Sequence, residues 1–229
     1  IVSSNIGLPI HHQCATGDMN ADGRTDLACW KGGNSWEWTL SRGDAWDPPI
    51  AVVNGPRVTD VAERCVAADF NADSRTDLAC FTSKDNLWYI GYSNGTGWDQ
   101  PAIVPGPKVD VPLGHRCLFG DFNADRRTDM SCFVSGHNGD TAWALFLATG
   151  TPAGFVQKAF TGPAGYPPIA NHCVAMDFNG DTKTDISCYT LGNQGYHTFT
   201  SSGESFRDRK ESEELRRAAS ERVHRLLDR

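Results

Sequence analysis

Short stretches rich in aromatic and β-branched residues recur along this chain, and each contains a glycine turn followed by a second short apolar stretch. The four stretches read WEWTLSRGDAW, LWYIGYSNGTGW, AWALFLATGTPAGF and YHTFTSSGESF. This spacing predicts several short antiparallel strands per unit, joined by Gly-rich turns. The predicted fold class is therefore all-β.

An acidic segment precedes each of these stretches and sets the period of the chain. Its four copies begin at Asp18, Asp69, Asp121 and Asp177, at intervals of 51, 52 and 56 residues. Such a period is typical of propeller blades. The fourth unit has only 34 residues from Cys173 to Phe206, and residues 1–13 resemble the segments that precede the other acidic copies. We therefore expect residues 1–206 to form a β-propeller of four blades, closed by the N-terminal strand, which completes the last blade.

The composition changes after Phe206, because residues 207–229 contain no Gly, Pro or aromatic residue. Leu215, Ala219, Val223 and Leu226 form a narrow apolar stripe at helical spacing. The segment is predicted to be a C-terminal amphipathic α-helix. An isolated helix of this length is marginal in water, so its stripe should pack against the propeller, a second copy, a different protein or a further domain. A solvated linker is the alternative.

The cysteines form four pairs that share one spacing of fifteen residues. The pairs are Cys14 and Cys29, Cys65 and Cys80, Cys117 and Cys132, and Cys173 and Cys188. This regularity favours one disulfide per repeat and hence an oxidising compartment, whereas buried thiols that pack as small apolar groups are the alternative. Zinc is disfavoured because no CxxC pair occurs.

Two aromatic positions recur when the units are aligned on Gly43, Gly95, Gly150 and Gly203. The first position holds Trp36, Trp88, Trp143 and Tyr196, and the second holds Trp46, Trp98, Phe155 and Phe206. These rings either fill the space between neighbouring blades or form platforms on which sugars stack. The sequence leaves both interpretations open.

Each acidic segment reads DxNxDxxxD and supplies oxygen donors at positions 1, 3, 5 and 9, with a backbone carbonyl at position 7. The candidate metal ligands are Asp18, Asn20, Asp22, Arg24 and Asp26; Asp69, Asn71, Asp73, Arg75 and Asp77; Asp121, Asn123, Asp125, Arg127 and Asp129; and Asp177, Asn179, Asp181, Lys183 and Asp185. Hard cations such as Ca²⁺ bind such donors in tight loops. An EF-hand is excluded because position 12 is a cysteine. Aspartates that cap turns are the alternative.

Charge supports about four Ca²⁺ ions, one per repeat. The chain up to residue 203 carries 13 basic and 21 acidic residues, and twelve of these acids are loop aspartates. Four divalent cations would make this part formally neutral, whereas without metal each loop holds three carboxylates at short range. A sequence pI near 5.4 disfavours nucleic acid as a partner.

The four segments GDMNADGRTD, ADFNADSRTD, GDFNADRRTD and MDFNGDTKTD resemble the FG-GAP or VCBS-type repeat. This resemblance covers residues 1–206 and implies a β-propeller with one calcium loop per blade. Similar repeats occur in integrin α-chain heads, in fungal propeller lectins and in bacterial toxin components, and the paired cysteines look most like the bacterial secreted forms. The better-known propellers of this type have about seven blades, so the four copies form either a four-bladed ring or half of a larger ring that assembles from more than one chain.

The resemblance and the composition lead to a secreted lectin-like module that binds a glycan or a cell-surface receptor, as the targeting subunit of a larger assembly. Polar residues before each first cysteine, among them His12, His115 and His172, are candidate ligand contacts together with Trp36, Trp88, Trp143 and Tyr196. Solvated strand ends are the alternative for these histidines. The competing function is a scaffold subunit of a multi-component toxin, docked through the C-terminal helix.

We expect no enzymatic activity and no membrane span. Neither a GxSxG elbow, an HExxH helix nor a Gly-rich phosphate loop occurs. No run of roughly 18 apolar residues exists. The chain starts with Ile1 and has no leader-like stretch, so any secretion signal is expected to have been removed or to be absent from this sequence.

Overall fold

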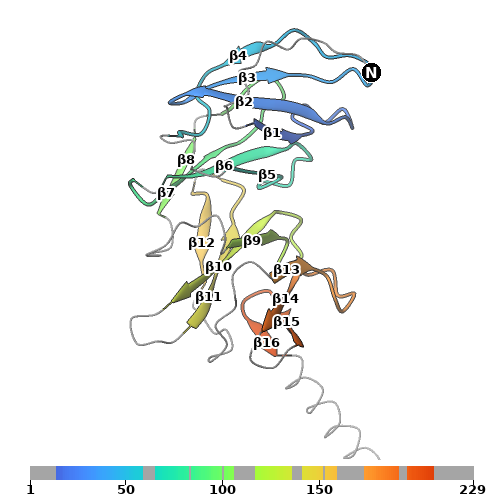
Figure 1. Ribbon diagram of the computed structural model, residues 1–229, viewed down its shortest axis with the longest axis vertical. Coiled ribbons are helices and arrows are strands. Elements are labelled where there is room, and N and C mark those ends of the chain that lie inside the picture. Colours follow the sequence, from blue (N-terminus) through green and yellow to red (C-terminus); the bar gives the residue numbers. More distant parts are fainter. Residues whose placement is uncertain are drawn as a thin grey trace, which may run out of the picture. The chain divides into compact units, whose positions relative to one another are not determined.

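Antiparallel strands make up all the regular structure that the computed structural model describes. It describes residues 14–58, 65–82, 84–99, 101–105, 117–135, 141–151, 153–158, 173–190 and 195–208. Sixteen strands form four four-stranded sheets within these ranges (Figure 1). No helix occurs in the described ranges, and none of them contains a segment long and apolar enough to cross a membrane as a helix.

Each sheet is a simple meander of consecutive strands, which is the arrangement of a propeller blade. Sheet 1 contains β1 (Cys14–Gly17), β2 (Asp26–Gly32), β3 (Ser35–Thr39) and β4 (Ile50–Val52). Sheet 2 contains β5 (Cys65–Ala68), β6 (Asp77–Thr82), β7 (Leu87–Gly91) and β8 (Ala102–Pro105). Sheet 3 contains β9 (Cys117–Gly120), β10 (Asp129–Ser135), β11 (Thr141–Ala148) and β12 (Phe155–Gln157). Sheet 4 contains β13 (Cys173–Met176), β14 (Asp185–Thr190), β15 (Gly195–Ser201) and β16 (Phe206–Asp208).

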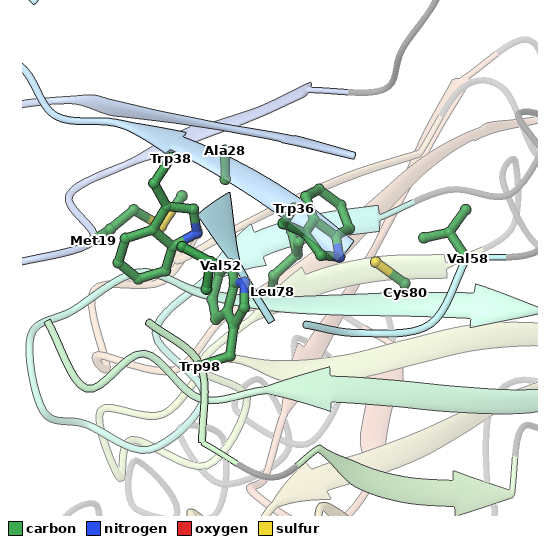
Figure 2. Close-up of a cluster of buried hydrophobic side chains, with 9 residues drawn as sticks. All are labelled: Met19, Ala28, Trp36, Trp38, Val52, Val58, Leu78, Cys80 and Trp98. Atoms are coloured by element: carbon green, nitrogen blue, oxygen red, sulfur yellow. The ribbon is translucent and has the colours of Figure 1, made fainter. Parts of the chain in front are cut away.

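The chain packs into two units. The first contains sheets 1 and 2 together with residues 126–128 and 148–156, and the second contains most of sheet 3 and sheet 4. Met19, Trp36, Trp38 and Trp98 are prominent in the core of the first unit, which Figure 2 shows. In the second unit Phe122, Trp143, Leu145, Ile186, Phe199 and Phe206 form the core.

The predicted disulfides are confirmed. Bonds join Cys14 to Cys29, Cys65 to Cys80, Cys117 to Cys132 and Cys173 to Cys188. In every sheet the two cysteines lie directly opposite each other on the first two strands. Each bond therefore ties the base of a hairpin whose tip is one of the acidic segments.

The predicted closure of the ring by the N-terminal strand is wrong. Sheet 4 has its own fourth strand, because β16 pairs with β15 through Phe199 and Asp208, Thr200 and Arg207, and Ser201 and Phe206. Its fourth position is thus filled by the residues that follow the last turn, and no closed sheet is found in the described part of the chain.

The proposed boundary of the C-terminal helix also changes. Arg207 and Asp208 were predicted to begin that helix but lie in β16. Residues 209–229 lie outside the described residues, as do residues 1–13. The helix and its partner therefore remain predictions from the sequence.

Candidate functional site

The four acidic loops join the first and second strands of each sheet. Positions 4 and 6 of every loop have a positive φ, between 59° and 81°. They are Ala21, Ala72, Ala124 and Gly180 at position 4, and Gly23, Ser74, Arg126 and Thr182 at position 6. Two left-handed residues so close together turn the backbone tightly and direct its amides inwards.

The aspartate at position 1 accepts hydrogen bonds from these inward amides. Asp18 Oδ1 accepts from the amide of Asp22 at 3.0 Å, and Asp18 Oδ2 accepts from the amide of Gly23 at 2.8 Å. Asp69 and Asp177 accept equivalent bonds from the position 6 amides. The aspartates thus cap turns, which is the role that the sequence left open as the alternative to metal binding.

The aspartate at position 9 is buried and joins its loop to the later turn of the same sheet. Asp77 Oδ2 accepts from the amide of Phe70 at 2.9 Å, and Asp77 Oδ1 accepts from the amide of Ser93 at 2.8 Å. Asp26 and Asp185 make the same pair of bonds in sheets 1 and 4. Burial raises the pKa of Asp77 to about 7, against the effect of these bonds, and the neighbouring Asp73 and Asp69 add to the rise.

The basic side chain at position 7 bridges the loop and that turn, a role that the sequence prediction missed by assigning only its carbonyl. Arg75 Nε donates to the carbonyl of Ser93 at 2.9 Å, and Arg75 Nη2 contacts Asp73 Oδ2 at 2.5 Å. Arg24 makes the equivalent two contacts in sheet 1. Lys183 contacts Asp181 at 3.2 Å in sheet 4.

A separate pocket of about 290 Å³ lies in the first unit. Its lining combines backbone turns with polar and apolar side chains from sheets 1 and 2. The lining residues are Gly33, Asn34, Asn54, Gly55, Arg57, Tyr89, Pro101 and Ile103. They come from four separate stretches of sequence, so no local motif marks the pocket.

The wall around Asn54 and Gly55 depends on an unusual backbone. Asn54 has a φ of 62°, which asparagine adopts more readily than most residues. A Cβ atom at Gly55 would lie 2.0 Å from Trp36 Cδ1, so only glycine fits there. The amide of Gly55 donates to the carbonyl of Asn34 at 3.1 Å. These constraints fix the two pocket asparagines relative to each other.

One carboxylate orders the polar side of the pocket. Tyr89 Oη donates to Asp85 Oδ2 at 2.9 Å, Thr82 Oγ1 donates to Asp85 Oδ1, and Arg57 Nη1 lies 4.0 Å from Asp85 Oδ2. Burial alone would raise the pKa of Asp85, but these hydrogen bonds, the amide of Leu87 and the charge of Arg57 lower it. Burial and the bond to Asp85 raise the pKa of Tyr89, so its hydroxyl stays protonated.

The sequence of the acidic loops is shared with known proteins. Residues 18–80 and 69–132 match the family described as FG-GAP-like repeat, and together they span half of the chain. The chain belongs to the FG-GAP-like repeat family. Its two matched segments each run from the first residue of one acidic loop to the second cysteine of the next repeat.

Two other proteins resemble this FG-GAP-like chain over different lengths. Protein linkin from Caenorhabditis elegans is 30% identical over 107 residues, which are 44% of this chain and 16% of linkin. A solved structure of an Agrocybe aegerita lectin has a TM-score of 0.69 at 17% identity, and the match covers 86% of this chain and 50% of that one. Its title describes the specific recognition of non-reducing terminal N-acetylglucosamine. The chain therefore spans at most half the length of these two proteins, and the lectin shares its fold.

The donor set of the FG-GAP-like loops fits a hard cation by its chemistry. In the described residues no three His, Cys, Asp or Glu side chains are grouped as metal ligands. The loop oxygens face backbone amides instead. Each carboxylate oxygen has two lone pairs, and Asp77 uses one on each oxygen for an amide, so each Asp77 oxygen keeps one lone pair for a cation. Asp73 Oδ2 accepts from both Asn71 Nδ2 and Arg75 Nη2, so these donors would have to turn away for Asp73 to bind an ion through that oxygen.

The aromatic and histidine residues predicted to contact a ligand are placed as follows. Trp36, Trp88 and Trp143 are buried. A stacking platform needs an exposed ring face, so these three side chains are not available for sugar stacking in this structure. The side chain of Tyr196, and all of His12, His115 and His172, lie outside the described residues.

Proposed function

We propose that this FG-GAP-like chain is a secreted, lectin-like binding module that recognises a carbohydrate through the pocket lined by Asn34, Asn54, Arg57 and Tyr89. The observation that carries the proposal is the pocket itself. It combines amide, guanidinium and phenol groups, which suit sugar hydroxyl and acetamido groups, with the apolar edges of Pro101 and Ile103. Its volume of about 290 Å³ matches a single small ligand.

Two further observations support this proposal. The Agrocybe aegerita lectin shares the fold, although that likeness alone does not transfer its ligand. The four disulfides are typical of proteins from oxidising compartments, which is where a secreted lectin would act. The scaffold function predicted as the alternative would need no ligand in this pocket.

Replacing Arg57 with alanine is expected to weaken saccharide binding about tenfold, because a charged hydrogen-bond donor is lost from the pocket. A glycan array followed by titration calorimetry with N-acetylglucosamine and the best array ligand would measure this. The matched control is Arg42→Ala, since Arg42 is an exposed arginine that pairs with Asp47 outside the pocket. Equal loss in both variants, or no binding to any saccharide, would contradict the pocket and favour the scaffold function.

We also propose Ca²⁺ as the ligand of the acidic loops. The side-chain oxygens of loop positions 1, 3, 5 and 9 and the carbonyl of position 7 would hold the ion, whose positive charge would offset the clustered carboxylates. The buried Asp77 supports this, because its pKa is raised by burial and by two neighbouring carboxylates, and a cation there would favour its charged form.

Adding calcium at about a hundredfold above its Kd should stabilise the parent protein by about 2.7 kcal/mol per occupied site. The Asp73→Ala variant should gain less, because it lacks one ligand. Urea unfolding with millimolar calcium, with magnesium and with chelator would measure the difference. Asp44→Ala is the control, since Asp44 is exposed and lies outside the loops. A gain in Asp73→Ala equal to that of the parent would show that this loop does not bind the ion.

A further inference from the structure

Inside each unit, an aromatic residue from the turn of one repeat covers the second residue of the acidic loop in the repeat before it. Trp98 packs with Met19 in the core of the first unit, and the ring centroids of Trp98 and Trp38 are 4.8 Å apart (Figure 2). In the same unit, Phe155 contacts Phe70, with ring centroids 5.7 Å apart.

The second unit repeats the arrangement. Phe206 contacts Phe122, with ring centroids 5.5 Å apart. At all three junctions both partners are buried, and Met19, Phe70 and Phe122 are fully buried.

Backbone hydrogen bonds accompany every one of these contacts. The amide at loop position 8 donates to the carbonyl at position 1 of the preceding loop: Thr76 to Asp18 at 2.6 Å, Thr128 to Asp69 at 2.7 Å and Thr184 to Asp121 at 2.7 Å. Two of the junctions add a hydroxyl from the turn. Ser93 Oγ donates to the carbonyl of Met19 at 2.6 Å, and Ser201 Oγ donates to the carbonyl of Phe122 at 2.7 Å.

The first repeat presents the donor half of this junction to solvent. Trp46 occupies the turn position of Trp98, Phe155 and Phe206, yet it is 37% exposed. Thr25, at loop position 8, is exposed, whereas its three equivalents are partly buried. Ser41, at the position of Ser93 and Ser201, is also less buried than they are. We call Thr25, Ser41 and Trp46 the donor surface.

The last repeat presents the acceptor half. Phe178 stands at the position of the buried Met19, Phe70 and Phe122 but is 38% exposed. Asp177, whose carbonyl is the acceptor position, is exposed as well, and Met176 and Val174 of β13 are about half exposed. We call Val174, Met176, Asp177 and Phe178 the acceptor surface.

We propose that the donor surface of one copy binds the acceptor surface of a second copy, head to tail. The interior junctions show which group covers which, and the described part of one chain exposes both halves. Trp46 would cover Phe178, the amide of Thr25 would donate to the carbonyl of Asp177, and Ser41 Oγ would donate to the carbonyl of Phe178.

One residue of the acceptor surface is much larger than its equivalents at the interior junctions. Met176 stands where Gly17 and Gly120 pack so tightly that a Cβ would lie 2.3 Å from Thr76 and 2.5 Å from Thr184. Ala68 at this position in sheet 2 shows that the junction accepts a Cβ. The unbranched side chain of Met176 can bend over the neighbouring surface, and there it adds apolar area. Because the two halves are different surfaces, the contact is heterologous and forms either a closed dimer or a longer array.

Sedimentation velocity of the full chain over a range of concentrations tests this proposal, with calcium present throughout. We expect the mass of two or more copies. Trp46→Ser and Phe178→Ser should each weaken the association about tenfold or more, because each removes one side of the central contact. Val53→Ser is the control, since Val53 is an exposed apolar residue outside both surfaces. Unchanged melting curves would show that the variants fold.

Mixing the two variants separates a head-to-tail contact from any other. Trp46→Ser keeps the acceptor surface and Phe178→Ser keeps the donor surface. At a concentration where each variant alone is monomeric, an equal mixture of the two should therefore form a dimer. A parent protein that stays monomeric at all concentrations overturns the proposal. The proposal is also overturned if each single variant associates as strongly as the parent protein, or if the mixture of the two variants stays monomeric.

Discussion

Replacing Trp98 with alanine is expected to destabilise the first unit by about 3–5 kcal/mol. The indole is buried and joins sheet 2 to the rings of Trp36 and Trp38, at centroid distances of 6.5 and 4.8 Å. Truncation would remove both contacts and leave a large cavity in a core that cannot collapse around it. Equilibrium urea unfolding, followed by tryptophan fluorescence and by circular dichroism, would measure the loss.

Two variants show whether this effect comes from the junction. Trp98→Phe should retain most of the stability, because phenylalanine fills the same position at Phe155 and Phe206 and the buried indole N–H has no acceptor among the described residues. Trp46→Ala, at the exposed equivalent position, should cost about 1 kcal/mol or less in dilute solution. A similar loss in Trp46→Ala and Trp98→Ala would contradict the assignment of Trp98 to a packed junction.

Removing the disulfide of sheet 2 with Cys65→Ala and Cys80→Ala is expected to cost about 3 kcal/mol. The bond closes a loop with a sequence separation of 15 residues, so it restricts the unfolded chain around one acidic loop. Urea unfolding under non-reducing conditions would measure the shift in midpoint. The single variant Cys65→Ala should lose about as much stability as the double one. An unchanged midpoint in the double variant would show that the hairpin is held by its hydrogen bonds alone.

The sequence predicted the features that repeat at fixed spacing. The pairing of Cys65 with Cys80 followed from a constant separation, and the strands followed from apolar stretches around the turn glycines. Gly43, Gly95, Gly150 and Gly203 do have positive φ values. These features are local, because each depends on residues within about one hairpin.

The errors concern features that local patterns do not carry. β16 is three residues long, and its charged Arg207 and Asp208 read as the start of a helix, so the fourth sheet seemed to need the N-terminal strand. The sequence left Trp36 open between packing and a sugar platform, since a ring that packs between sheets and a ring on a surface have the same spacing in the sequence; in the structure Trp36 is buried. The pocket was missed because Asn34, Asn54 and Tyr89 meet only after two sheets have formed.

The bond from the position 8 amide to the position 1 carbonyl joins one loop to the next without using a side chain. Two repeats can therefore be joined with any residue at position 1 and any residue other than proline at position 8, provided that their loops keep the same backbone. Each new repeat would bring its own disulfide, its own turn aromatic, and the position 8 amide and position 1 carbonyl that bond to neighbouring repeats. Duplication of one such segment in a gene would lengthen the protein by a whole four-stranded sheet without any further change to its neighbours.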